Sequence, residues 1–356
     1  MSEMNEDLRL LRDAARDWIG GTAPLDARRD DSASVRSGRW RAMVEMGWAG
    51  VAIDEAHGGL DLGFAAVAAL QQELGRELLP APLLSSAIAA RLLRRFGTPE
   101  QRENWLPQLA GGAVIALAAD LESRHASVNA TRTSAGWRLQ GEHRFVPDAR
   151  DAQALIVAAR HESEPMLFIV AAQQLRREPL NMVDGGDFAH VHFDVELPVS
   201  AQLAADDAAA ALAYLLDLAR IGIASEMLGS ADRALEITCD YLRIRKQFDQ
   251  AIGSFQALQH RAALMLVDIE LARSCIEAAL DAADGGPDLP ELAVVAKATA
   301  NDALHRVSSE IVQMHGGIGM TAEHVAGLYL KRARVAETLY GNTAAQARRY
   351  ADIRGF

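Results

Sequence analysis

The spacing of apolar residues changes twice along this chain, and the change limits the folds that the chain can adopt. Residues 7–112 carry a helical period broken by turns, and Thr98 and Pro99 have the composition of a helix start. Residues 114–199 carry the two-residue period of half-buried strands. After residue 206 the helical spacing returns and continues to the end. This order of helix, sheet and helix predicts an α+β fold.

The predicted sheet rests on four short segments. In HVHFDVEL, residues 190–197, apolar and polar side chains alternate. The apolar runs at residues 155–159 and 166–170 are short enough to be buried strands. Residues 137–140, followed by Gly141, predict another strand that ends in a turn. Together they indicate a small β-domain in the middle of the chain.

The last third of the chain predicts a helical bundle. Helical patterns at residues 257–283 and 289–315 flank a Gly-Gly-Pro turn, and a final helix is expected after Gly319. Arg220 falls off the apolar face of the preceding helix. The predicted parts are an all-α N-terminal domain at residues 1–112, the β-domain at 113–203 and the C-terminal helical bundle at 204–356.

Composition excludes several classes of protein. With 356 residues, half of them hydrophobic, the chain is expected to form two or three packed units. A formal charge of −12 argues against binding to nucleic acid or to an anionic membrane. No uninterrupted apolar run is expected to be long enough to span a bilayer, and the acidic N-terminus is unlike a signal peptide. We therefore expect a cytoplasmic protein.

Cysteine and histidine give no sign of a metal site. Cys239 and Cys275 lie in apolar helical patterns and are interpreted as small buried residues rather than a disulfide framework. His143, His190 and His192 have a spacing that fits no metal site, so we expect solvated strand residues.

The stretch from Tyr241 to His260 concentrates groups that can hold a diphosphate beside a flat ring. A predicted helix ends on cations that include Arg245, as helix C-termini generally favour. The helix dipole explains the cations alone. It does not explain why Phe248, a turn at Gly253 and Gln256 occur beside them. A guanidinium can grip phosphate oxygens bidentately, and a side-chain amide can pair with a polar heterocycle or a ribose.

This stretch resembles the flavin-contact segment of the acyl-CoA dehydrogenase family, in which Arg-x-x-Phe precedes a hydrophobic-Gly turn and a Phe-Gln. QMHGGIG, residues 313–319, resembles that family's other short signature, and residues 46–63 and 73–86 resemble its N-terminal part. The resemblance covers nearly the whole chain in the family's order. It implies FAD as cofactor and an acyl-CoA thioester as substrate, and leaves the electron acceptor unknown. The cofactor-binding residues that it implies are Arg245, Gln247, Phe248, Gln256, Gln313, Gly316 and Gly317.

The family's catalytic base is missing. Desaturation of an acyl thioester needs a base for the α-proton, which in the family is a glutamate before Gly-Thr. The family's spacing places Tyr340 at that position, and Ala219 at the position that other members use. A tyrosine, with a pKa of about 10, is mostly protonated at neutral pH. The resemblance therefore assigns no catalytic residue, and Glu337 and Asp217 are expected to be surface or capping charges.

The middle of the chain also departs from the family pattern. Residues 118–127 replace the family's glycine-rich loop and contain no glycine. Residues 145–148 (Phe-Val-Pro-Asp) replace the Trp-Ile-Thr-Asn segment that lies beside the flavin. Pro147 cannot donate a backbone hydrogen bond, and no hydroxyl group remains.

The retained and missing segments follow a division within the family. In its dimers each flavin lies across two chains, and the glycine loop, the Trp-Thr segment and the base come from one of them. This chain resembles the neighbour, which supplies the segments at residues 245–256 and 313–317. We interpret it as the non-catalytic subunit of a heteromer, expected to be an α2β2 heterotetramer, in which a related chain supplies the glutamate. Such pairs often act on bulky substrates such as steroid side-chain thioesters.

Two alternatives remain open. The chain could be a stand-alone FAD-dependent dehydrogenase or oxidase-like relative with a relocated base such as Glu337, Asp148 or Asp120. It could also be a binding or scaffold protein that kept the fold and lost the flavin. Glu73 and Arg76, in the N-terminal part, are expected to form a surface or interface pair rather than to act as catalysts.

Overall fold

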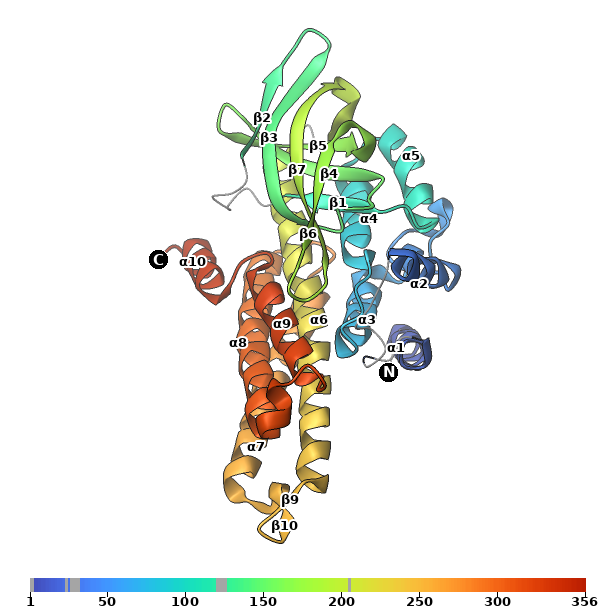
Figure 1. Ribbon diagram of the computed structural model, residues 1–356. Coiled ribbons are helices and arrows are strands. Elements are labelled where there is room, and N and C mark those ends of the chain that lie inside the picture. The colour runs from blue at the N-terminus through green and yellow to red at the C-terminus, as the bar shows by residue number, and fades with distance from the viewer. Residues whose placement is uncertain (1–2, 23–24, 26–32, 120–126, 204–205) are drawn as a thin grey trace. The chain divides into compact units, whose positions relative to one another are not determined.

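The computed structural model describes residues 3–22, 25, 33–119, 127–203 and 206–356 (Figure 1). The chain divides into two compact units, which interleave along the sequence. The first unit consists of Met1–Asp31, Ala68–Leu79 and Arg220–Phe356, and the second of Ser32–Val67 and Pro80–Ala219. The predicted order of helices, strands and helices is confirmed. The domain boundaries at residues 112 and 203 stay a prediction.

The second unit contains an eight-stranded mixed sheet. Its strand order is β6-β7-β3-β2-β4-β5-β8, and β1 pairs in parallel with β4 outside this path. The strands are β1 (Ile115–Ala118), β2 (Ser127–Arg132), β3 (Gly136–Pro147), β4 (Ala154–His161), β5 (Glu164–Ala171), β6 (Arg176–Asn181), β7 (Asp187–Pro198) and β8 (Gln202–Leu203).

The predicted burial of the strands is largely confirmed. Residues 155–159 of β4 are fully buried, as expected for an interior strand. In β7 the apolar Val191 and Phe193 are buried, whereas Asp194 between Phe193 and Val195 is exposed. The alternation places one face of the strand on the core and the other toward solvent.

Two expectations about β3 are wrong. The strand does not end at Gly141, which pairs with both β2 and β7 at φ 132° while the strand continues to Pro147. His143 is not solvated, because β3 lies inside the sheet and its inward-facing residues are covered. His143 is 2% exposed, and its Nε2 lies 2.8 Å from the carbonyl oxygen of Ala158. His190 and His192 are half-buried.

Helices α2 (Ala33–Glu45), α4 (Leu83–Phe96) and α5 (Pro99–Ala110) belong to the second unit. The predicted start of α5 is confirmed as a capping box, in which Thr98 Oγ1 accepts from the backbone of Gln101 and the Gln101 side chain accepts in return from Thr98. Trp40 of α2 packs against the sheet core, and its Nε1 donates to Gly112 O at 2.9 Å.

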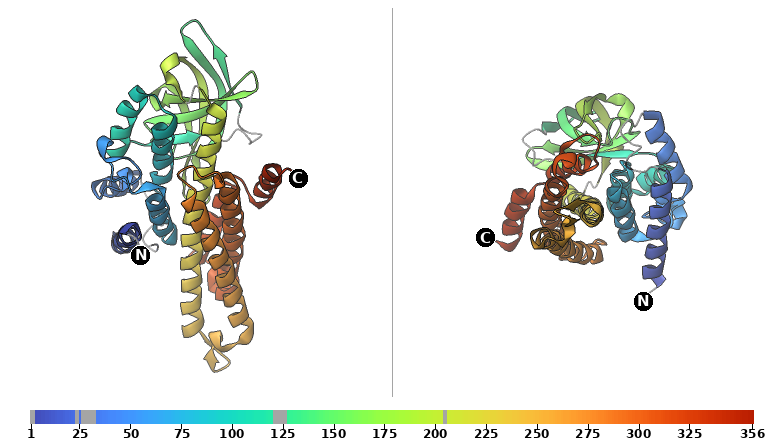
Figure 2. Two further views of the ribbon diagram at one scale, coloured as in Figure 1. Left: turned by 180° about the vertical axis from the view of Figure 1, so that it is seen from behind. Right: turned by 60° about the horizontal axis from the view of Figure 1, so that its bottom comes forward.

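The first unit is mainly helical and contains α1 (Glu3–Thr22), the end of α3 (Gly63–Arg76) and most of α6 (Ala208–Ile244). The predicted long helices are confirmed as α7 (Gln256–Asp281) and α8 (Leu289–His315). Figure 2 shows α6, α7 and α8 as neighbouring elements of a bundle, in which Asp232 of α6 binds Arg273 of α7 at 2.8 Å. The prediction of a single final helix was wrong, because the segment that contains Gly341 separates α9 (Ala326–Thr338) from α10 (Thr343–Arg354).

Helix α6 corrects the expectation that no apolar segment is long enough to span a bilayer. By length and composition this helix could cross a bilayer. However, 72% of its most apolar 18-residue window is buried inside the protein, which is the property of a core helix. The described residues therefore offer only weak evidence for a membrane segment.

Three charged residues that the sequence pattern did not place in the core are buried. Glu73 is 1% exposed, because Arg16 binds both of its carboxylate oxygens at 2.9 Å and Arg76 lies at 3.6 Å. Arg220 and Asp217 are 3% and 1% exposed. Cys239 and Cys275 are free cysteines, but they are half-buried rather than buried as expected. Helical period alone does not reveal ionic partners from other elements.

Two glycines allow α3 and α6 to approach closely within the first unit. A Cβ atom at Gly229 would lie 1.8 Å from the carbonyl oxygen of Gln72, and one at Gly75 would lie 2.0 Å from that of Glu226. Ser230 Oγ donates to Gly75 O at 2.9 Å. Because the obstructing atoms belong to the backbone, we expect Gly229→Ala to destabilise the protein by about 3 kcal/mol.

Thermal unfolding of the isolated chain measures this effect. The matched control is Gly327→Ala in α9, where an added Cβ meets no atom within 4 Å. Alanine is the better helix former, so this control is expected to be neutral or to stabilise by up to about 1 kcal/mol. Equal unfolding temperatures for the two variants would contradict the close approach at Gly229.

Candidate functional site

A tight hairpin follows the end of α6. It consists of β9 (Lys246–Gln247), β10 (Gln250–Ala251) and a two-residue turn at Phe248 and Asp249. Both turn residues are left-handed, with φ 53° and 62°, as a type I′ turn requires. Asn and Gly are favoured there, and a left-handed phenylalanine is a strained exception of the kind that is enriched at functional sites. Phe248 is also 86% exposed.

Arg245 presents an available cation beside this hairpin. Its backbone accepts a hydrogen bond from Ile252 N at 2.8 Å, which fixes the start of the hairpin. The nearby Arg243 is occupied by Asp240 at 2.7 Å. Within the described part of the chain, the Arg245 guanidinium has no carboxylate partner. An exposed guanidinium without an ion pair is suited to bind a phosphate group.

The hairpin brings the other predicted residues of this stretch together. Gln247 is exposed, and its Nε2 donates to Lys246 O at 2.7 Å. The Phe248 ring packs edge-on against Phe255, with ring centroids 6.0 Å apart. Phe255 is the N-cap of α7, so the exposed Gln256 is the first residue of that helix. The hairpin and the start of α7 therefore form one exposed surface.

The end of α8 supplies the second predicted segment. Gln313 is exposed in the last turn, and Gly316 N donates to Gln313 O. Gly316 has φ 65° and ψ −140°, a conformation that needs glycine. A Cβ atom added at Gly316 or Gly317 would meet nothing within 4 Å. This backbone is open to close approach by a ligand, which fits a dinucleotide cofactor.

Tyr241 connects the two segments. It lies one turn before Arg245, and its hydroxyl group donates to the carbonyl oxygen of His315 at 3.3 Å. The sequence interpretation did not single out Tyr241 or His315. The sequence signal that could have identified them is that they lie close in sequence to Arg245 and to the Gly-Gly pair. Their contact spans 74 residues, which periodicity cannot reveal.

The positions considered for a catalytic base hold no free carboxylate among the described residues. Tyr340 is left-handed at φ 56°, and Ala219 is buried. Glu337 binds Arg334 at 2.8 Å and lies 3.3 Å from His305 Nδ1. The second candidate for a relocated base, Asp148, accepts a hydrogen bond from the Ser85 hydroxyl. The remaining candidate, Asp120, lies outside the described residues, as does most of the segment that replaces the glycine-rich loop.

The segment that replaces Trp-Ile-Thr-Asn is irregular. The register of β3 against β7 shifts between His143 and Val146, and Phe145 within this bulge has φ 55°. Phe145 is half exposed, and its ring packs edge-on against His190 with centroids 4.9 Å apart. Pro147 offers no N–H group. This strand end presents a phenyl ring where the family has an indole and a hydroxyl group.

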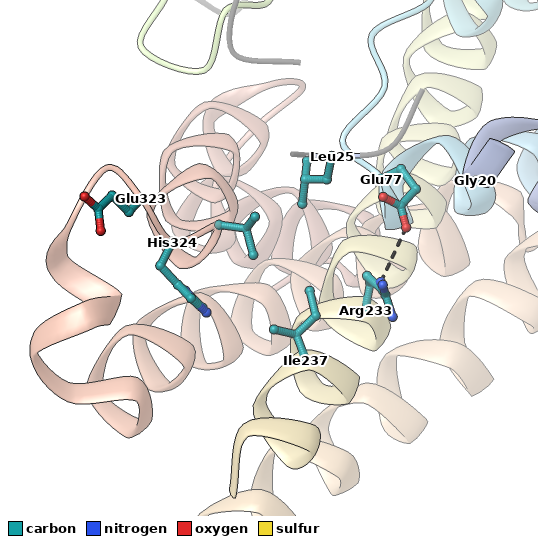
Figure 3. A pocket seen from close by; sticks show the side chains of 8 residues that line it. Gly20, Leu25, Glu77, Arg233, Ile237, Glu323 and His324 are labelled. Carbon is teal, nitrogen blue, oxygen red and sulfur yellow. Dashed lines mark ion pairs between the residues drawn. The ribbon is translucent and has the colours of Figure 1, made fainter. Parts of the chain in front are cut away.

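A cavity of about 510 Å³ lies elsewhere in the first unit (Figure 3). Glu77 and Arg233 form an ion pair at its wall, 3.4 Å apart. None of the predicted cofactor-binding residues lines it; the lining residues are Gly20, Leu25, Glu77, Arg233, Ile237, Glu323, His324 and Val325. The predicted cofactor surface is therefore distinct from this cavity. In the described ranges, no three His, Cys, Asp or Glu side chains gather as a metal site would require.

Family models match the N-terminal and C-terminal parts of the chain, and a curated relative matches nearly all of it. The model described as "Acyl-CoA dehydrogenase, N-terminal domain" matches residues 5–113, and "Acyl-CoA dehydrogenase, C-terminal domain" matches residues 209–353. The acyl-CoA dehydrogenase FadE27 of Mycobacterium tuberculosis is 31% identical over 98% of this chain and 96% of its own length.

Solved structures agree with this assignment. A variant of the Tcur3481–Tcur3483 steroid ACAD is 31% identical, with a TM-score of 0.91 over 99% of this chain and 98% of that chain. The ChsE4–ChsE5 complex from Mycobacterium tuberculosis is 27% identical, with a TM-score of 0.89 over 100% of this chain and 98% of that chain. From the fold, the paired segments and these relatives together, we conclude that the chain belongs to the acyl-CoA dehydrogenase family.

Proposed function

We propose that this chain is the non-catalytic subunit of a heteromeric acyl-CoA dehydrogenase that desaturates an acyl-CoA thioester. It contributes one wall of a flavin site, and a related chain contributes the glutamate and most of the ring pocket. The observation that carries the proposal is that the retained cofactor-binding residues are exposed whereas the position of the base holds no carboxylate. Arg245 and Phe248 are displayed on an exposed surface, while Tyr340 occupies the position of the base.

The retained surface is suited to hold one end of FAD. The Arg245 guanidinium would bind the diphosphate, and the exposed backbone at Gly316 and Gly317 would let the cofactor approach closely. Gln256 and Gln313 would donate and accept hydrogen bonds with the polar parts of the dinucleotide. FAD, when bound, supplies the acceptor for the hydride that leaves the β-carbon of the thioester.

Proton removal is assigned to the partner chain. A general base must reach the α-proton in its ionised form. Tyr340 does not meet this condition at neutral pH, since a phenol has a pKa of about 10. The ion pair of Glu337 with Arg334 and the hydrogen bond of Asp148 with Ser85 also disfavour a relocated base. These contacts make the stand-alone enzyme the weaker hypothesis.

The similar structures support a heteromer. Two of them are named as paired proteins, the Tcur3481–Tcur3483 ACAD and the ChsE4–ChsE5 complex. The first is described as a steroid ACAD, which favours a bulky thioester such as a steroid side chain for this protein. We propose an α2β2 heterotetramer as the assembly, located in the cytoplasm.

Flavin content and turnover test the proposal. The chain would be purified alone and after co-expression with a related family member that retains the glutamate. We expect no turnover alone, and about one FAD per pair of chains together, because each mixed dimer has one complete site. As a control, Tyr340→Phe in the complex is expected to leave turnover within about twofold, since the phenol does not act as the base.

The alternatives give different results. Full flavin loading and turnover by the isolated chain would establish a stand-alone enzyme. Absence of flavin both alone and in the complex would indicate a binding or scaffold protein. A large loss of turnover in the Tyr340→Phe complex would show that this chain takes part in the chemistry, which contradicts the proposed division of labour.

A further inference from the structure

Three aromatic rings stack at the junction of the helices that end in the two predicted cofactor segments. The rings of Tyr241 and His315 have centroids 4.4 Å apart, at an interplanar angle of 31°. The His315 ring continues to His324, with centroids 4.2 Å apart at 42°. Tyr241 belongs to α6, His315 is the last residue of α8, and His324 precedes α9. The stack therefore joins three helix ends within the first unit.

Each ring is also bound to the backbone beside it. The Tyr241 hydroxyl donates to the carbonyl oxygen of His315, immediately before Gly316. Arg245 N donates to the Tyr241 carbonyl oxygen at 2.9 Å, so the backbone of Tyr241 fixes where Arg245 leaves the helix. On the other side, the backbone of Ala326 donates to His324 Nδ1 at 3.1 Å, at the start of α9.

The buried histidine is constrained to one protonation state. His315 is 3% exposed, and its Nδ1 donates to Ile311 O at 2.7 Å, because a carbonyl oxygen can only accept. Its Nε2 is buried and has no hydrogen-bonding partner among the described residues. Burial lowers the pKa of His315 and His324 adds to this effect, whereas the hydrogen bond to Ile311 opposes it. The ring is therefore neutral at pH 7, with its proton on Nδ1.

We propose that Tyr241, His315 and His324 are positioning residues that hold the Arg245 turn and the Gly316–Gly317 turn in register for one dinucleotide. The inference rests on the proposed function, since it concerns how this chain grips FAD. Both turns are exposed, and a Cβ atom added at Gly316 or Gly317 would meet nothing within 4 Å. A ligand that binds both turns loses affinity when the distance between them fluctuates. Binding must then fix that distance, which costs conformational entropy.

Packing alone predicts a different result from positioning. If the stack only fills space, removing the Tyr241 hydroxyl while keeping its ring would have no effect on the end of α8. If the hydroxyl couples the turns, Tyr241→Phe on α6 will loosen residues 313–319, which lie more than 70 positions away. The fold itself should persist, since the ring and its stacking remain.

Amide hydrogen exchange of the isolated chain and FAD binding by the complex test the coupling. For Tyr241→Phe we expect about two- to tenfold faster exchange in residues 313–319 and a similar increase in the Kd for FAD, with the unfolding temperature lowered by no more than a few degrees because one hydrogen bond is lost. Tyr241→Leu, which also removes the ring, should have the larger effect. The control is Tyr350→Phe, because Tyr350 is also half-buried and its hydroxyl donates to Glu291 at 3.2 Å. The control should change neither quantity.

The outcomes separate the two proposals. Wild-type exchange in residues 313–319 of Tyr241→Phe would overturn the coupling. Faster exchange with an unchanged Kd for FAD would overturn its role in cofactor binding. A wild-type complex that takes up no FAD would instead refute the proposed function, and the exchange measurement on the isolated chain would still show whether the turns are coupled.

Discussion

Replacing Arg245 by alanine is expected to weaken FAD binding by the heteromeric complex roughly 10- to 150-fold. The change removes a charge-assisted hydrogen bond to phosphate, worth about 1.5–3 kcal/mol. The Arg245 side chain is exposed and makes no ion pair among the described residues, so its removal leaves no buried charge behind. Titration of the apo-complex with FAD, followed by flavin fluorescence, measures the effect.

Arg243→Ala is the matched control for this substitution. Arg243 lies on the same helix end and is also exposed, but its guanidinium binds Asp240 at 2.7 Å. Its removal should change FAD affinity less than about twofold, since exposed ion pairs contribute little. Equal losses in the two variants would mean that general positive charge attracts the cofactor. Unchanged FAD affinity in Arg245→Ala would remove the phosphate contact from the proposed site.

Replacing Lys297 by methionine is expected to stabilise the protein most at pH 7 and below. Lys297 is fully buried in α8, where its Nζ donates to Asn301 Oδ1 and to the carbonyl oxygen of Ala336 at 3.2 Å. Burial lowers the pKa of Lys297 from 10.5 to about 7, and Arg220 lowers it further while Glu337 opposes the shift. The buried amine therefore penalises the folded state whenever it is charged.

The sign of the pH dependence follows from this lowered pKa. Between about pH 7 and 10.5 the unfolded chain binds a proton at Lys297 that the folded chain does not, so wild-type stability rises with pH. The methionine variant lacks this contribution. One proton is worth about 1.4 kcal/mol per pH unit, so the stability advantage of the variant should shrink by about 2 kcal/mol between pH 7 and 9.

Thermal unfolding of the wild-type chain and of Lys297→Met at several pH values measures the change. The variant loses the hydrogen bonds to Asn301 and Ala336, which offsets part of its gain in stability. This loss is nearly the same at every pH, so it does not change the pH dependence. Lys331→Met is the control, because Lys331 lies exposed on α9. A difference between Lys297→Met and wild type that stays constant with pH would show that the amine is not held neutral in the fold.

Hydrophobic period predicted those elements of the fold that depend on neighbours along the chain. The strand at residues 155–159 and the helix start at Thr98 are encoded within a few residues, and both are confirmed. The hairpin at Phe248 was not predicted. Its turn lacks the Asn-Gly or Asp-Gly pair that signals a type I′ turn, so only the surrounding structure holds it there.

Burial of charge was beyond the reach of the sequence pattern. Glu73 was expected in a surface or interface pair, whereas its carboxylate is buried and is bound by Arg16, 57 positions away. His143 was expected in solvent, but strand order places it inside the sheet. A polar residue is buried when another element supplies its partner, and that partner is distant in sequence.

The chain's residues were sufficient to predict the family and the order of helix, strand and helix. These predictions depend on composition, short motifs and local spacing, which reflect interactions between residues that are close in sequence. The three-dimensional arrangement decided that Arg245 has no ionic partner among the residues that the structure describes, that Phe248 is held in a strained turn, and that Tyr241 reaches His315. Such properties arise from atoms that only folding brings within hydrogen-bonding distance, so no linear pattern contains them.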